Sequence, residues 1–364
     1  MKRFWPLALL ILLVGALYLR PTPTQLRPTL HGPWIVQEPV AAVEPPAPAA
    51  SIPAPVAEAV APAAETPPEE TNEQAMSRST IGAGLLWLAR HQNPDGSFGD
   101  GPATIGGRTI GKTGITALAI LSFLGAGYSQ LSKDEFDGDK SIGEVVKKSL
   151  KWFLQDMRED GTFGSGYDVA FDQVLACLAL SEAYGMTASH LLKEPAEKAL
   201  ESMYRMQGAD GSWGGPEVTA WACHAIASAE LSELPSPKAV QESVLQYLDT
   251  VSHPGNAVNR IQLTKKRDTA AAEAGAAAAS LPQSDSRDFL DWLHVTYSVF
   301  QYAGPDGPLW QQVNEPMKRA IVPLQDRNGA WQGGTGSHTV VRTSLAELTL
   351  QVYYRYANIY GSAR

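Results

Sequence analysis

The strongest constraint on the fold is a short turn motif that recurs four times along the chain. Each copy has Asp or Asn, then Gly, then a small residue and an aromatic residue. Asp and Asn hydrogen-bond their own backbone, Gly adopts a positive φ, and the aromatic ring covers apolar surface that a loop would leave wet. The motif therefore predicts four places at which the chain reverses. The copies are Asp95–Gly99, Asp160–Gly164, Asp210–Gly214 and Asn328–Trp331.

The segments on either side of these turns predict helices of two kinds. Those that precede a turn have apolar residues on one side, as at Ile81, Leu85 and Leu88, whereas 115–121 is apolar nearly all round. We therefore expect an outer helix before each turn and an inner helix after it. A Gln stands three residues before three of the turns, and the second turn has Gln155 at a longer offset. The three are Gln92, Gln207 and Gln325.

The inner-type segments predict an all-α fold. Each helix pair buries its apolar face only against its neighbours, so six inner helices surrounded by five or six outer ones make a closed α/α toroid. An open two-layer superhelix of the same pairs is the alternative. The inner segments are predicted near 112–126, 169–185, 218–232, 265–280, 289–303 and 338–357.

The amino terminus predicts export. Lys2 and Arg3 precede an apolar run over 4–19, which we interpret as an uncleaved signal anchor over 1–20 that leaves the rest of the chain on the outer side of the cell membrane. A cleaved signal peptide, giving a secreted protein, is the alternative. Residues 21–75 are rich in Pro and Ala and have no periodic apolar face, which predicts a disordered tether. The toroid is then predicted over 76–361.

The charge of the chain argues against a nucleic-acid-binding protein, and its cysteine content argues against a disulfide scaffold or a Cys-rich zinc fold. The chain has 29 basic and 38 acidic residues and a net charge of −9, which argues against a nucleic-acid partner. The two cysteines, Cys177 and Cys223, lie in apolar segments and form no Cys-x-x-Cys pair. We expect both to pack as small hydrophobic side chains.

The Gln and Asp-Gly-Ser-Trp/Phe-Gly turns resemble the repeats of squalene and hopene cyclases and protein prenyltransferase β subunits, over about 280 residues from Ile81 to Tyr360. Three segments look most like envelope-anchored bacterial proteins described only by these repeats. For those proteins the resemblance implies the toroid but no particular reaction. The segments are 113–128, 180–187 and 350–356.

The motifs that the resemblance implies for chemistry are incomplete. Triterpene cyclases protonate an alkene from an Asp-x-Asp-Asp cluster, which this chain lacks. Asp168 and Asp172, one turn apart at the start of an inner helix, are the best candidate acids, and we expect mutual repulsion to raise the pKa of one. Helix capping and hydrogen bonds between helices are the alternative roles for the pair.

A zinc site of the prenyltransferase type is also incomplete. Such a site pairs an Asp-x-Cys at the start of one inner helix with a His from another. Cys223 is preceded two positions earlier by Trp221 and not by Asp, although Glu217, His224 and His338 lie on the same or another inner segment. Neighbouring helical residues point about 100° apart, so Cys223 and His224 do not easily share an ion. We therefore expect no metal and no cofactor.

A ligand would contact aromatic side chains on the inner segments. The 289–303 helix offers several, and an aromatic lining suits an isoprenoid chain. We therefore predict a protein that binds an isoprenoid, another lipid or an envelope protein, without catalysis. The alternatives are an unusual terpene cyclase or prenyltransferase-like enzyme that uses Asp168 and Asp172, and a structural envelope module. The predicted pocket residues are Trp221, His224, Trp292, His294, Tyr297, Phe300 and His338.

Overall fold

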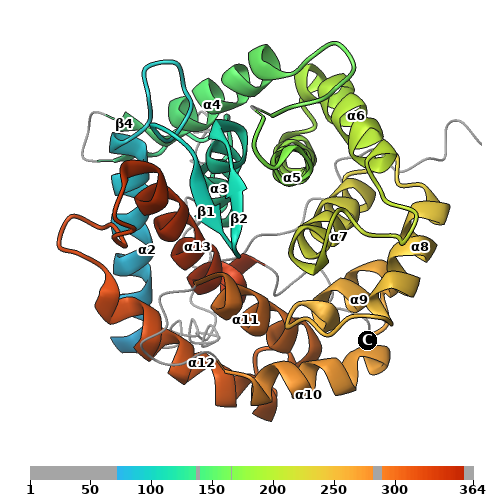
Figure 1. The fold of residues 1–364 in the computed structure, drawn as a ribbon. Coiled ribbons are helices and arrows are strands. Elements are labelled where there is room, and N and C mark those ends of the chain that lie inside the picture. Colours follow the sequence, from blue (N-terminus) through green and yellow to red (C-terminus); the bar gives the residue numbers. More distant parts are fainter. Residues whose placement is uncertain (1–71, 137–139, 165, 282–288, 356–364) are drawn as a thin grey trace, which may run out of the picture.

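Six inner and six outer α-helices form a closed ring in the computed structural model, which describes residues 72–136, 140–164, 166–281 and 289–355 (Figure 1). The inner helices are α3 (Lys112–Gly125), α5 (Val169–Thr187), α7 (Pro216–Leu231), α9 (Asn256–Thr264), α11 (Phe289–Ala303) and α13 (Gly336–Arg355). The outer helices are α2 (Asn72–Arg90), α4 (Ile142–Asp156), α6 (His190–Arg205), α8 (Lys238–Leu248), α10 (Ala271–Ala279) and α12 (Pro308–Ile321).

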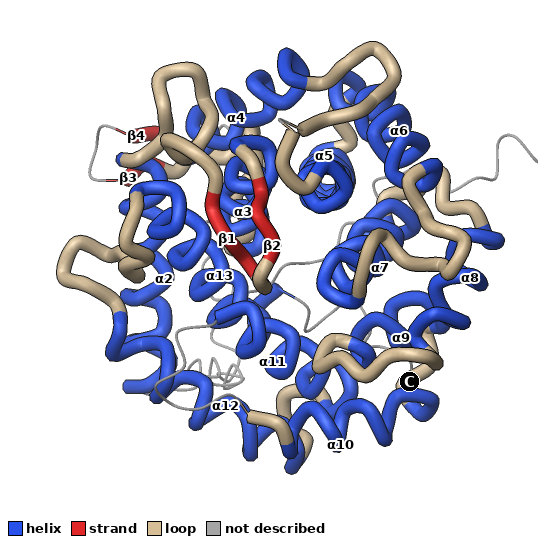
Figure 2. The backbone as a smooth tube through the Cα atoms, in the orientation of Figure 1, coloured by secondary structure: helices blue, strands red, loops and turns tan. Residues whose placement is uncertain are grey.

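Short elements fill the connections between these helices. The 3₁₀ turns are η2 (Asp268–Ala270) and η3 (Val322–Leu324). Two antiparallel hairpins pair β1 (Ala103–Ile105) with β2 (Arg108–Ile110), and β3 (Glu135–Phe136) with β4 (Lys140–Ser141). Figure 2 shows the first hairpin lying across one end of the inner ring.

The ring closes where the last helix pair meets the first. Helix α13 packs against both α3 and α2. In addition, Gln325 Nε2 donates to the carbonyl of Thr80 in α2 at 2.8 Å. These contacts confirm the predicted α/α toroid and exclude the open superhelix.

Each recurrent turn is stabilised by its own side chains. In three copies the Asp Oδ1 accepts from the backbone N–H and the hydroxyl of the residue two positions later, as Asp95 does from Ser97 at 2.9 and 2.6 Å. The aromatic ring that follows is fully buried or nearly so, and its backbone N–H donates to a side chain of the next inner helix. The four aromatic residues are Phe98, Phe163, Trp213 and Trp331.

The glycine of each turn is required by a close approach of the following outer helix. Gly211 has φ of +87°, and a Cβ placed on it would lie 2.3 Å from the carbonyl oxygen of Ser243 in α8. Gln207 Nε2 completes the junction by donating to the carbonyls of Gly211 and Val240 at 3.0 and 3.3 Å. The motif therefore joins each inner–outer pair to the next pair.

The second turn uses a different glutamine from the one expected. Gln173 on inner helix α5 donates to the carbonyls of Gly161 and Ala199, at 3.0 and 2.9 Å. This side chain performs the bridging role that Gln92, Gln207 and Gln325 perform elsewhere, whereas Gln155 is exposed on α4. In this copy the bridging glutamine stands ten positions after the aromatic Phe163, whereas in the other three copies it stands three positions before the turn.

The predicted inner helix over 265–280 is wrong. The inner member of that pair is α9, which is buried over most of its length and packs against both α7 and α11. The Ala-rich segment forms the outer helix α10, and most of its residues are exposed or half-buried. Alanine gives a helix little one-sided apolar pattern, so its face could not be assigned from periodicity.

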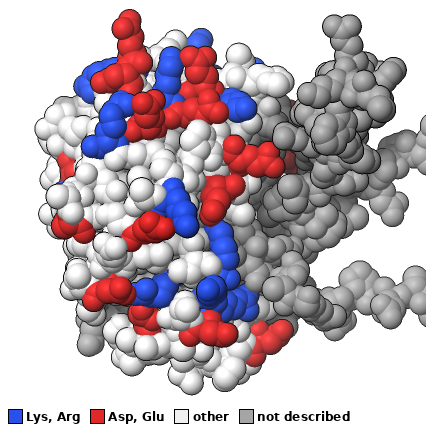
Figure 3. Space-filling model, turned by 90° about the vertical axis from the view of Figure 1, so that its right-hand side faces the viewer, with Lys and Arg blue, Asp and Glu red and all other residues white. Residues whose placement is uncertain are grey.

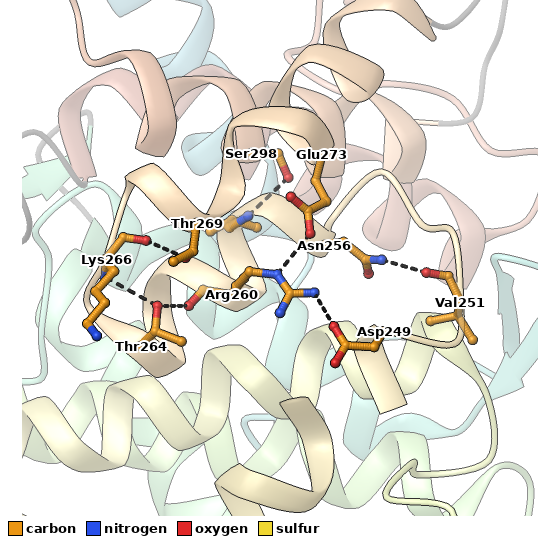
Figure 4. Close-up of polar contacts among 10 residues, drawn as sticks. Asp249, Val251, Asn256, Arg260, Thr264, Lys266, Thr269, Glu273 and Ser298 are labelled. Atoms are coloured by element: carbon orange, nitrogen blue, oxygen red, sulfur yellow. Dashed lines mark hydrogen bonds and ion pairs between the residues drawn. The ribbon is translucent and has the colours of Figure 1, made fainter. Parts of the chain in front are cut away.

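A network of polar contacts holds the short α9 between its neighbours (Figure 4). Arg260 of α9 donates to Asp249 beyond α8 and to Glu273 of α10, at 3.0 and 2.8 Å. Asn256 Nδ2 donates to the carbonyl of Val251 at 2.8 Å, and Ser298 Oγ of α11 donates to the carbonyl of Pro254 at 2.6 Å. These bonds hold the 249–255 connection against the ring.

The predicted signal anchor and most of the predicted tether lie outside the described residues. Helix α2 begins at Asn72, four residues before the predicted start of the toroid. Among the helices of the described ranges, none is both long and apolar enough to cross a membrane. On the face in Figure 3, basic and acidic side chains are interleaved over the described surface. Cys177 and Cys223 are unpaired and buried, as expected.

Candidate functional site

The β1–β2 hairpin lies over the amino-terminal ends of the inner helices. Its apolar side chains Ala103, Ile105 and Ile110 are buried, and they alternate with exposed threonines. The turn contains Gly106 and Gly107, both with positive φ, as a two-residue hairpin loop requires. The hairpin therefore covers this rim of the ring with one apolar face.

Polar contacts attach the hairpin to the starts of three inner helices. The backbone N–H of Thr104 donates to His338 Nε2 of α13 at 3.0 Å. Arg108 donates to the Asp168 carboxylate before α5, and its Nη1 donates to the carbonyl of Gly214 before α7 at 2.7 Å. The predicted site residues Asp168 and His338 thus both hold the hairpin.

Asp172 is fully buried and joins α5 to the start of α3. Its carboxylate accepts from the backbone N–H of Gly111 at 3.0 Å and of Gly114 at 3.1 Å. Burial raises the pKa of Asp172 to about 6, the two backbone donors oppose this, and the nearby Asp168 charge adds a smaller increase. A Cβ on Gly114 would lie 2.5 Å from Asp172 Oδ1, so the glycine makes room for the carboxylate.

The two acids of the predicted pair therefore have different partners. Asp168 caps α5 by accepting from the backbone N–H of Phe171 at 3.1 Å and also accepts from Arg108. Asp172 faces the first turn of α3. These contacts are the capping and inter-helix bonds that the sequence left open, and the catalytic role of the pair stays a prediction.

Beside the hairpin turn, three titratable side chains from three parts of the ring meet. Glu217 stands in the first turn of α7, His253 in the connection before α9, and His294 on α11. His253 Nε2 lies 3.0 Å from Glu217 Oε1, and His294 Nε2 lies 3.4 Å from Glu217 Oε2. One ligand atom from each residue lies within 4.8 Å of the other two. We call these residues the Glu–His–His cluster.

The cluster is largely closed to solvent, and Glu217 is its most exposed side chain. The side chains of His253 and His294 are 4% and 1% exposed, and that of Glu217 is 24% exposed. Burial acts to raise the pKa of Glu217, but the contacts with the two imidazoles outweigh it and hold that pKa well below its usual range. Burial lowers the pKa of His253, which favours the neutral ring. The cluster thus combines an ionised carboxylate with imidazole nitrogens.

Gly106 places the hairpin turn directly on this cluster. A Cβ on Gly106 would lie 3.4 Å from Glu217 Cγ and 2.9 Å from a methyl of Leu290 at the start of α11. The hairpin therefore contacts α11 as well as α13, α5 and α7.

Four of the predicted pocket residues pack together between α7, α9 and α11. Trp221 meets the rings of His224 and His294 edge-on, with centroids 5.9 and 6.3 Å apart, and His224 stacks on Tyr297 at 4.8 Å. Gln262 of α9 links His224 Nδ1 to the Tyr297 hydroxyl, at 2.7 and 3.0 Å.

The remaining predicted pocket residues lie apart from that group. Phe300 packs edge-on against Trp310 of outer helix α12 at 4.9 Å, so it lies between the two layers of the ring. Trp292 is 1% exposed on α11, and His338 is at the hairpin. Trp221, Trp292, Tyr297 and Phe300 are each less than 5% exposed, so these rings are packed side chains.

Sequence reasoning missed His253 and Arg108. His253 stands in a short His-Pro-Gly connection without a repeat turn, and placing the inner helix at 265–280 moved it away from the rim. The Arg108 hairpin had a usable signal, since Gly106-Gly107 separates two short segments containing Thr and Ile. Glu217 was considered for zinc with Cys223 and His338, but its neighbours are His253 and His294.

Comparison with known proteins supports the fold of this chain but does not identify its function. No protein-family description and no curated protein matched the sequence. The structure resembles type II terpene cyclase MstE from Scytonema bound to geranylgeranyl dihydroxybenzoate, with 11% identity over 78% of this chain and 99% of that chain, at a TM-score of 0.50.

It also resembles an inactive variant of the α-1,6-mannanase GH76A of Salegentibacter sp. HEL1_6 bound to α-1,6-mannotriose. The identity is 13% over 77% of this chain and 99% of that chain, at a TM-score of 0.52. Both are α/α toroids, so the fold of this chain is that of the terpene cyclase-like toroids. Because the same fold holds a prenylated ligand in one protein and a saccharide in the other, the fold does not indicate which kind of ligand this chain binds.

Proposed function

We propose that this protein is an exported toroid, held at the outer face of the cell membrane by its amino-terminal segment and tether, that binds a hydroxyl-rich ligand such as an envelope saccharide. The ligand binds at the hairpin-covered rim, next to Glu217. The single observation that carries this proposal is the partly exposed Glu217 side chain, whose ionised carboxylate lies between two buried imidazoles. A carboxylate of this kind accepts hydrogen bonds from ligand hydroxyls.

The surroundings of Glu217 support a polar ligand over an isoprenoid. Arg108 and Asp168 lie on the same rim with partly exposed side chains, and the neighbouring Tyr167 is 48% exposed, which offers an aromatic face beside hydrogen-bonding groups. The aromatic residues that were expected to contact an isoprenoid chain are packed among the helices instead. An apolar chain would gain little from the groups that the rim presents.

A glycan array followed by titration calorimetry tests the proposal. We expect binding of a saccharide to the full-length protein, and at least a tenfold loss of affinity in Glu217→Gln. Farnesyl and geranylgeranyl diphosphate serve as isoprenoid probes, and Glu233→Gln, at the opposite ends of the inner helices, is the matched control. Binding of the isoprenoids alone, or equal saccharide affinity in the Glu217 variant, would refute the proposal.

An envelope protein as partner is a second candidate, favoured by three exposed leucines. Leu131, Leu191 and Leu231 are 67%, 78% and 52% exposed. Leu131 follows α3, Leu191 lies in the first turn of α6 after α5, and Leu231 is the last residue of α7. They lie at the rim opposite the hairpin, so such a partner would not compete with the saccharide site. Crosslinking in cells, with Leu191→Ser as the comparison, tests this candidate.

The enzyme alternative rests on Asp172, whose raised pKa keeps part of the population protonated near pH 6. Both oxygens of this carboxylate accept backbone hydrogen bonds from the start of α3. That arrangement suits a structural acceptor better than a proton donor to an alkene. Incubation with squalene or prenyl diphosphates, with Asp172→Asn as the control, tests this alternative by product formation.

A further inference from the structure

We propose that Glu217, His253 and His294 bind one divalent transition-metal ion, for which Zn²⁺ has the best match in ligand type and spacing. The three residues supply one carboxylate oxygen and two imidazole nitrogens. Zinc takes such ligands at about 2.1 Å in a tetrahedron, whose edges are then about 3.4 Å long. Glu217 Oε1 lies 3.0 Å from His253 Nε2 and Glu217 Oε2 lies 3.4 Å from His294 Nε2, and one ligand atom from each residue lies within 4.8 Å of the other two. Bringing all three around one ion therefore requires the longest of these separations to shorten toward the edge of the tetrahedron.

The second observation is that three buried polar atoms inside the cluster make no hydrogen bond to any described residue, although Glu217 Oε2 and His294 Nε2 lie 3.4 Å apart. Glu217 Oε2 and both ring nitrogens of His294 are buried, and no protein group in the described structure hydrogen-bonds to them. Buried polar atoms are normally paired, and an unpaired one calls for an explanation. An ion bound by Glu217 Oε2 and His294 Nε2 would satisfy two of these three atoms.

Charge also fits a cation at this place. The cluster supplies one carboxylate oxygen and two imidazole nitrogens close together, a donor set that divalent transition-metal ions bind. A divalent ion would be balanced in part by the Glu217 carboxylate, and the Glu217 side chain is 24% exposed. Three protein ligands leave a fourth position for water or a ligand oxygen.

The turn at Gly255 determines which ring nitrogen of His253 carries the proton. The backbone N–H of Gly255 donates to His253 Nδ1 at 3.0 Å, so the neutral ring carries its proton on Nε2, toward Glu217. Coordination through Nε2 moves this proton to Nδ1, and the Gly255 N–H must then turn away. A Cβ on Gly255 would lie 3.0 Å from His253 Nδ1 and 3.2 Å from His294 Nδ1, so the glycine leaves space around both nitrogens.

The metal site reverses the sequence-based expectation of no metal and uses a different set of residues from the incomplete one around Cys223. It deepens the proposed function, because an ion at Glu217 offers a coordination position to a ligand hydroxyl. Its test needs no saccharide, so metal binding and saccharide binding can fail separately.

Titration of untagged, chelator-stripped full-length protein with ZnCl₂ tests the site, with CoCl₂ as a spectroscopic probe. We expect one equivalent to bind, and a visible cobalt absorption typical of tetrahedral coordination. Glu217→Gln and His294→Asn are expected to weaken zinc binding at least tenfold and to lose the cobalt band. His190→Asn, which changes an exposed histidine at the start of α6, should bind as the wild type does.

X-ray absorption of the zinc-loaded wild type keeps the test independent of variant folding. Two nitrogen ligands from imidazoles and at least one oxygen ligand near 2.0–2.1 Å support the site. Absence of stoichiometric binding, a sulfur ligand, or equal zinc affinity in folded Glu217→Gln would overturn it. In that case the cluster is a hydrogen-bonded group without an ion.

Discussion

At the residue scale, two buried carboxyl groups make the stability of the fold depend on pH. Asp172 and Glu347 are both fully buried, and burial raises the pKa of each. A carboxyl whose folded-state pKa is raised stabilises the fold at low pH and loses that contribution as the pH rises through the folded pKa. Each of these groups therefore makes the protein less stable at neutral pH than at mildly acidic pH.

For Asp172, the pKa of about 6 against an ordinary value of 3.8 sets the pH window. The contribution falls by at most about 3 kcal/mol between pH 4 and pH 7. Asp172→Asn cannot ionise, so the difference in unfolding free energy between wild type and variant should change by this order over that window. Urea unfolding from pH 4 to 7.5 measures it. A constant difference would show that Asp172 is ionised throughout.

For Glu347, burial raises the pKa well above its ordinary value of 4.5. Its Oε2 accepts from Gln351 at 3.0 Å, and a Cβ on Gly84 of α2 would overlap its Oε1, so the acid sits between α13 and α2. We expect the protonated acid in the fold, and Glu347→Gln should therefore keep the packing and become more stable than wild type as the pH rises above 4.5. Thermal unfolding across this range checks it. A variant that loses stability at pH 9 would contradict the neutral form.

At the element scale, the recurrent turn is the device that holds one helix pair against the next. The Gln of the turn donates to a backbone carbonyl of a neighbouring outer helix, and this contact recurs at three junctions of the ring. The junction depends on backbone approach, because the Gly lies against a carbonyl of the following outer helix.

Gly211→Ala tests this dependence. The new Cβ would meet the Ser243 carbonyl at 2.3 Å at a backbone φ of +87°, so we expect a loss of about 3 kcal/mol in unfolding free energy. Gly275→Ala is the matched control, because Gly275 is exposed on α10 with open space around it. That variant should be unchanged or more stable by up to about 1 kcal/mol. Chemical denaturation of both variants provides the comparison, and equal stability would refute the role of the turn.

The elements show where sequence reasoning succeeded and where it stopped. The turn motif and the change from one-sided to all-round apolar helices predicted five of the six inner helices and the ring. The sixth failed because α9 is only nine residues long and has no preceding motif, whereas the Ala-rich α10 looked equally apolar. The hydrophobic pattern of a helix indicates which of its residues are buried. It does not indicate which side chains from different helices come into contact.

At the scale of the whole molecule, the candidate site forms where three consecutive inner helices of the ring meet. Glu217, His253 and His294 are far apart in sequence and become neighbours because α7, α9 and α11 run side by side. The sequence placed Glu217 and His294 on inner helices, but it paired Glu217 with Cys223 and His338. His338 lies instead at the far anchor of the hairpin, where it accepts from Thr104.

The most direct test of this account is anomalous diffraction at the zinc edge from crystals of the zinc-loaded protein. We predict one strong peak on the hairpin-covered rim, bonded to Glu217 and to the Nε2 atoms of His253 and His294. A map without a peak among these three side chains, or with the three residues on separate parts of an unclosed ring, would contradict it.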